Sequence, residues 1–109
     1  MKLIIGGAHQ GKREYARKNY GENASLVADF HLFVLDLIKK GVEPVDYIEG
    51  HLQEYRDKII ICDDIFCGIV PASPIERKWR ESLGRALAVI AGESDEVVRV
   101  FCGLGMKIK

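Results

Sequence analysis

The chain has 109 residues, of which 48% are hydrophobic and 29% are charged. This length suffices for one hydrophobic core and excludes a second domain of ordinary size. Sixteen basic residues balance sixteen acidic ones, which argues against a bulk attraction to nucleic acid or to an anionic membrane. We therefore expect a single domain over residues 1–109, with no nucleic-acid or membrane partner, that holds any polyanion locally.

The cysteines and the apolar runs indicate the cellular compartment of the protein. No apolar run approaches the roughly 18 residues that a membrane-spanning helix needs, and no signal-peptide pattern precedes the first apolar segment. Three cysteines, Cys62, Cys67 and Cys102, form no C-x-x-C pair, which argues against a disulfide framework or a zinc site. We expect a cytoplasmic protein in which Cys62 and Cys102 are buried as small hydrophobic side chains.

The first predicted elements are a strand, a glycine-rich loop and a helix. The apolar residues 3–5 lead into Gly6-Gly7-Ala8-His9-Gln10-Gly11-Lys12-Arg13, and a helix is expected over residues 13–19, ending near Gly21. Gly6, Gly11 and Lys12 have the spacing of a loop whose amides and lysine face a phosphate. We interpret residues 6–13 as a site for ATP or GTP; the alternative is an ordinary tight turn with a solvated lysine.

Arg13 stands where the complete motif has Ser or Thr. That hydroxyl is a ligand of the Mg²⁺ ion that accompanies the nucleotide, and a guanidinium cannot ligate a cation. The sequence therefore makes a Mg²⁺ cofactor doubtful.

Strands and helices alternate along the rest of the chain. In the first half we expect a strand at 25–29, a buried helix at 30–38, a helix from Pro44 to Tyr55 and a strand at 58–62. A loop at 65–73 then leads to a long helix from Pro74, whose buried stripe is Ile75, Trp79, Leu83, Ala86 and Ile90. The chain is expected to end with a strand at 95–101, a turn at 103–105 and an edge strand at 106–108. This alternation predicts an α/β fold: a three-layer, P-loop NTPase-like domain with a mainly parallel sheet of four to five strands.

Acidic residues follow two of the predicted strands, at Asp29 and at Asp63-Asp64. In a parallel sheet these positions meet the glycine-rich loop at the carboxyl edge, where ligands bind. Such a carboxylate usually holds magnesium, and the pattern alone favours Asp63 or Asp64 over Asp29. The alternative for Asp29 and for Asp64 is a helix-capping or solvent-facing role.

The histidines do not suggest a catalytic triad. His9 lies inside the loop, where we expect it to face solvent, although its ring is placed to contact a phosphate or a second substrate. His31 lies in an apolar helix and His51 on the polar side of the next, and we interpret both as structural.

Four segments form a collinear series from residue 68 to the end of the chain: G-I-V-P at 68–71, R-K-W-R-E-S-L-G-R at 77–85, D-E-V at 95–97 and C-G-L-G-M-K-I-K at 102–109. In this order they resemble the bifunctional adenosylcobinamide kinase and adenosylcobinamide-phosphate guanylyltransferase family, which carries G-I-V-P, R-x-F-R-D-x-x-G-R, D-E-V and S-G-x-G-x-K-I-K. The family also opens with the loop G-G-A-R-S-G-K-S, where this chain has His9, Gln10 and Arg13 in place of Arg, Ser and Ser.

The resemblance implies a nucleotide-dependent kinase of cobalamin biosynthesis with a cobinamide-like acceptor, and a small homo-oligomer. It also implies that Asp29 is the magnesium carboxylate and that Asp63 and Asp64 lie close to the substrates, where the family has Asn-Glu. The family's longer middle segment, with the histidine that takes the guanylyl group, has no counterpart here. We therefore expect the guanylyltransferase step to be absent.

Two hypotheses for the function follow. In the first, a shortened kinase uses Lys12 and the loop amides to stabilise the transferred phosphate, while Asp63 or Asp64 accepts the hydroxyl proton. In the second, a degenerate relative binds a nucleotide or phosphate without turnover and has a regulatory or assembly role. Arg13 is the feature that separates them, because it removes a magnesium ligand.

Overall fold

The computed structural model describes residues 1–65 and 73–109 of the chain. The G-I-V-P segment and most of the predicted loop at 65–73 lie outside the described residues. The elements follow in the order β1 (Lys2–Gly6), α1 (Lys12–Tyr20), β2 (Leu26–Val27), α2 (Phe30–Lys39), α3 (Pro44–Gly50), the 3₁₀ helix η1 (Leu52–Tyr55), β3 (Ile59–Asp63), α4 (Pro74–Glu93), β4 (Glu96–Phe101) and β5 (Leu104–Lys107).

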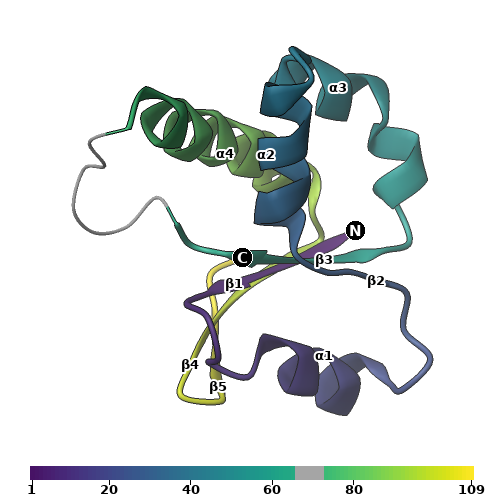
Figure 1. Cartoon of the computed structure of the whole chain (residues 1–109). Coiled ribbons are helices and arrows are strands. Elements are labelled where there is room, and N and C mark those ends of the chain that lie inside the picture. Colours follow the sequence, from purple (N-terminus) through teal and green to yellow (C-terminus); the bar gives the residue numbers. More distant parts are fainter. Residues whose placement is uncertain (66–72) are drawn as a thin grey trace.

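The five strands form one sheet in the order β2-β3-β1-β4-β5. Strands β2, β3, β1 and β4 are parallel, and β5 returns antiparallel to β4 as the edge strand. Helix α1 covers one face of the sheet, and α2, α3 and α4 cover the other (Figure 1). This confirms the predicted α/β fold, a P-loop NTPase-like arrangement of three layers.

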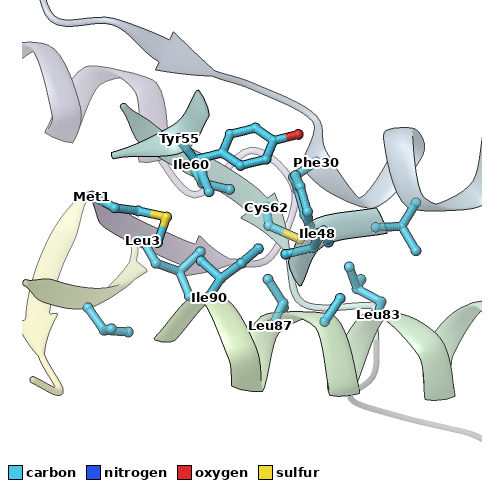
Figure 2. Close-up of a cluster of buried hydrophobic side chains, with 13 residues drawn as sticks. Met1, Leu3, Phe30, Ile48, Tyr55, Ile60, Cys62, Leu83, Leu87 and Ile90 are labelled. Atoms are coloured by element: carbon cyan, nitrogen blue, oxygen red, sulfur yellow. The ribbon is translucent and has the colours of Figure 1, made fainter. Parts of the chain in front are cut away.

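Successive side chains of the central strands point to opposite faces of the sheet, which divides the hydrophobic core into two clusters. Leu3 of β1 packs with α2, α3 and α4, while its neighbour Ile4 is fully buried on the α1 side. The larger cluster gathers Phe30, Ile48 and Ile90 over the sheet (Figure 2). Because both faces of β1 and β3 are covered, these strands are apolar nearly throughout, as buried parallel strands require.

Two predicted boundaries in the first half of the chain were wrong. The strand expected at 25–29 is only Leu26–Val27, because Asp29 has a φ of 54° that turns the chain into α2. The helix expected from Pro44 to Tyr55 ends at Gly50 and resumes as η1. Glycine is a weak helix former, and His51 after it has a non-helical φ of −123°.

Three expectations in the second half also need correction. Ile75 is 44% exposed, so the buried stripe of α4 begins further along the helix. The turn before the last strand is Cys102-Gly103, with φ values of 51° and 76°, and β5 begins at Leu104. Cys102 is therefore exposed at the tip of a hairpin, whereas Cys62 is buried as expected. No helix within the described ranges is long and apolar enough to cross a membrane.

Candidate functional site

The glycine-rich loop connects β1 to α1 at the carboxyl edge of the sheet. Each of its two outer positions requires glycine for a different steric reason. A Cβ on Gly6 would lie 2.4 Å from the carbonyl oxygen of Val100 in β4, so only glycine lets the two backbones approach this closely. Gly11 has a φ of 92° and forms the N-cap of α1. Together with His9, whose φ is 61°, these positions curl the chain around the start of the helix.

The curled loop leaves main-chain donors available. Within residues 1–65 and 73–109, the N–H groups of residues 8–11 donate no hydrogen bond to a main-chain carbonyl. The loop borders a pocket of about 340 Å³ that Asp29, Ile61 and Asp63 also line. Amides at the start of a helix attract anions, since the helix dipole adds partial positive charge there. The pocket thus has the donor pattern of a phosphate site.

Lys12 is the first residue of α1 and is held against the loop. Its side chain is only 7% exposed, and Nζ donates to the carbonyl of Gly7 at 2.6 Å. The same ammonium lies 2.8 Å from Oδ1 of Asp63, the last residue of β3. The pair forms because Asp63 lies opposite Gly6 in the parallel register of β1 and β3. Lys12 and Asp63 therefore meet in the pocket.

His31 contacts the other side of the same carboxylate. Its Nε2 lies 3.4 Å from Oδ2 of Asp63, and its Nδ1 accepts a hydrogen bond of 3.2 Å from the Asp63 main-chain N–H. Since Nδ1 is the acceptor, the proton of the neutral ring is on Nε2, which points at the carboxylate. Trp79 of α4 supports this arrangement, because its indole N–H donates to the His31 carbonyl at 2.7 Å.

This histidine is the residue that the sequence interpretation missed. His31 is 7% exposed and lies in an apolar helix, as expected, but its ring faces the pocket's carboxylate. The available signal was its position in the first turn of the helix after β2, because that turn meets the carboxyl edge of the sheet.

The two adjacent aspartates point to different partners. The Asp64 carboxylate lies 3.3 Å from the Arg99 guanidinium of β4, and its main-chain N–H donates to the Gly6 carbonyl at 3.0 Å. Asp63 lines the pocket and Asp64 does not. Of the two predicted candidates, the structure brings Asp63 to Lys12, whereas Asp64, which directly follows β3, pairs with Arg99 of β4.

Arg13 and Asp29 form a third contact at the rim. The Arg13 guanidinium lies 3.1 Å from Oδ2 of Asp29, with the two side chains 50% and 55% exposed. Both line the pocket. Asp29 precedes α2 without forming a side-chain cap, so the capping role considered for it is absent and its carboxylate is directed to Arg13.

The loop is also fastened to the C-terminal hairpin. Gln10 accepts the Cys102 N–H through its side-chain Oε1 at 2.7 Å and the Gly103 N–H through its main-chain carbonyl at 2.8 Å. A second hollow of about 560 Å³ lies between α1, the loop and the hairpin, with Tyr15 among its lining residues. It shares His9, Gln10 and Gly11 with the phosphate pocket, so the two hollows adjoin at the loop.

A further hollow of about 500 Å³ lies at the amino end of the sheet, near Arg56, Asp57 and Asp95. Ligands of open parallel sheets bind at the opposite, carboxyl end, where the loop lies. We therefore place the candidate site at the loop.

A family model described as cobinamide kinase / cobinamide phosphate guanyltransferase matches residues 31–108, more than half of the chain. The chain belongs to this family. No curated protein matches it.

The match to the cobinamide kinase family begins at His31, after the loop and after Asp29. It confirms the resemblance that the C-terminal segments suggested and supports a role in cobalamin biosynthesis with nucleotide substrates. The loop at 6–13 is outside the match, so its interpretation depends on its own geometry.

The magnesium ion that the resemblance implies does not fit the residues of this member of the family. The Ser or Thr ligand is replaced by Arg13, and the Asp29 carboxylate that would complete the site binds that arginine at 3.1 Å. Within residues 1–65 and 73–109, no three His, Cys, Asp or Glu side chains converge as a metal site. We derive no chemical step through magnesium.

Proposed function

We propose that this member of the cobinamide kinase family binds the phosphates of ATP or GTP in the loop Gly6–Arg13 and transfers the terminal phosphoryl group to a hydroxyl of a cobinamide-like acceptor. The observation that carries the proposal is the set of loop amides that donate to no main-chain carbonyl of the described residues, beside a pocket at the start of α1. Fixed donors of this kind stabilise oxyanions with little reorganisation. Family membership supports the acceptor class.

Lys12 is the proposed electrostatic group. Its ammonium is held by the Gly7 carbonyl and by Oδ1 of Asp63, at the mouth of the amide loop. A phosphate oxygen that enters the loop competes with Asp63 for the same ammonium. Binding thus transfers the lysine from the carboxylate to the nucleotide and releases Oδ1.

Asp63 is the proposed proton acceptor. The acceptor oxygen forms a bond to the γ-phosphorus while the bond from that phosphorus to the β–γ bridging oxygen breaks. The hydroxyl proton passes to Oδ1 of Asp63, and the nucleoside diphosphate leaves. His31 is a positioning residue in this scheme, because its contact at 3.4 Å holds Oδ2 and directs Oδ1 towards the pocket. Asp64 bonds to Arg99 and has no part in the step.

The second candidate function is nucleotide or phosphate binding without turnover, in a regulatory or assembly role. The contact between Arg13 and Asp29 favours it, since Arg13 replaces the hydroxyl that would bind magnesium and also occupies the Asp29 carboxylate. The absence of the guanylyltransferase step and the presence of a homo-oligomer both stay predictions of the resemblance.

The experiment has a binding arm and a turnover arm. Thermal unfolding is measured with and without ATP and GTP for the wild type, Lys12→Ala and the control Arg17→Ala, which removes an exposed cation one turn further along α1. A nucleotide at 100 times its Kd stabilises by about 2.7 kcal/mol, which raises the Tm by roughly 10 °C for a domain of this size. Chromatography then measures the transfer of labelled γ-phosphate to cobinamide.

The kinase proposal requires that a nucleotide raises the Tm of the wild type and of Arg17→Ala, that Lys12→Ala loses this shift, and that cobinamide becomes labelled. A Tm shift without labelled product selects the second candidate function. No shift with either nucleotide overturns both.

A further inference from the structure

We propose that the Arg13 guanidinium takes the place of the divalent cation in the phosphate pocket, so that this chain binds its nucleotide free of metal. This inference deepens the proposed function and rests on the loop being a nucleotide site. It identifies the ligand as a nucleoside di- or triphosphate without Mg²⁺.

Every aspartate carboxylate of the rim is already in contact with a cationic side chain. Asp63 lies 2.8 Å from Lys12, Asp29 lies 3.1 Å from Arg13, and Asp64 lies 3.3 Å from Arg99. A hard divalent ion needs several oxygen ligands and gives up its water reluctantly. To bind an aspartate carboxylate here it must first displace an ammonium or guanidinium, which disfavours a metal on these aspartates.

Arg13 has the position and the free N–H donors to replace the divalent cation. It follows Lys12 directly in the first turn of α1, at the place of the motif's metal-binding hydroxyl, and it lines the pocket. A guanidinium has five N–H donors, of which Asp29 engages Nη2 at a single oxygen. The remaining donors form no other hydrogen bond or ion pair within residues 1–65 and 73–109. Their fork suits two oxygens of one phosphate group.

Asp29 then acts as the anchor of this arginine. Its φ of 54° places it at the abrupt turn between β2 and α2, and its carboxylate reaches across the rim to α1. In a magnesium site this residue would hold the cation against the phosphates. Here it holds a guanidinium in the same region, so the roles of both positions change together.

The test is isothermal titration of ATP and GTP into the full chain, once in excess Mg²⁺ and once in EDTA. The proteins are the wild type, Arg13→Ser, which restores the hydroxyl of the motif, and Arg17→Ser, which removes another exposed charge on the same helix. Thermal unfolding without nucleotide checks that the two variants are folded equally well.

We expect the Kd of the wild type and of Arg17→Ser to differ by less than threefold between Mg²⁺ and EDTA. Arg13→Ser should bind at least tenfold more weakly in EDTA and regain affinity with Mg²⁺. A wild-type affinity at least tenfold higher in Mg²⁺ overturns the inference and leaves the proposed nucleotide site intact. An Arg13→Ser variant that matches the wild type in EDTA, or that Mg²⁺ fails to rescue, also overturns it. If the wild type binds neither nucleotide in either buffer, the proposed function itself is wrong.

Discussion

The ammonium group of Lys12 lies 2.8 Å from Oδ1 of Asp63, which joins the first turn of α1 to the last residue of β3. The lysine is 7% exposed and the aspartate 26% exposed, so water screens the pair only in part. The carboxylate neutralises the lysine and at the same time opposes the entry of a phosphate.

Asp63→Asn should separate binding from turnover. The amide removes a negative charge beside the phosphate pocket, so nucleotide affinity should rise by roughly threefold to tenfold. The amide is a poor proton acceptor, so kcat for phosphoryl transfer should fall by about 100-fold or more. Titration calorimetry and product formation measure the two effects. The control is Asp46→Asn on the exposed side of α3, and weaker binding by Asp63→Asn would contradict the prediction.

His31→Ala should lower kcat by about tenfold and leave the KM for the nucleotide within about twofold. The ring holds Oδ2 of Asp63 and is not among the residues that line the pocket. His31→Gln should recover part of the loss, since its amide N–H can donate to the same oxygen. Steady-state kinetics with Tm as a folding check measures both. A raised KM with unchanged kcat would show that His31 contacts substrate instead.

Gly6→Ala should destabilise the fold by about 2 kcal/mol, because the new Cβ meets the Val100 carbonyl at 2.4 Å and the strands must separate. The matched control is Gly84→Ala in α4, where nothing lies within 4 Å of the added methyl group. That substitution should stabilise the chain by about 0.5–1 kcal/mol through helix propensity. Urea unfolding measures both, and equal effects would exclude the steric argument.

The buried thiol of Cys62 should make the protein lose stability at alkaline pH. Burial, together with the nearby Asp63 charge, raises the pKa of Cys62 to about 12. The unfolded chain releases this proton from about pH 8.5 upward while the folded chain retains it, so the free energy of unfolding falls as pH rises above that value. Between pH 9 and 11 the slope from this group should be about 1 kcal/mol per pH unit.

Urea unfolding at several pH values tests this slope. Cys62→Ala should flatten it, and Cys102→Ala, which changes an exposed cysteine, should leave it as in the wild type. Burial raises the pKa of Tyr20 and of Tyr55 as well, so part of the alkaline loss should persist in Cys62→Ala. An unchanged slope in that variant would mean that the thiol does not contribute.

Much of the fold was predictable from the sequence because its signals are local. The apolar run at 59–62 indicated a strand covered on both faces, and the structure buries all four residues between the helical layers. Pro44 and Pro74 were correctly placed at helix starts. The errors, such as the short β2 and the break at His51, occurred where a single backbone angle overrides the surrounding pattern.

The sequence by itself determined the α/β class, the loop at Gly6–Arg13 and the family, because each depends on spacing along the chain. Only the tertiary structure decided how the charged residues pair: Asp63 with Lys12 and His31, Asp64 with Arg99, and Asp29 with Arg13. These partners are 16 to 51 positions apart along the chain. They meet because parallel strands bring their carboxyl ends to one edge of the sheet, and a linear pattern does not encode which carboxylate then faces which cation.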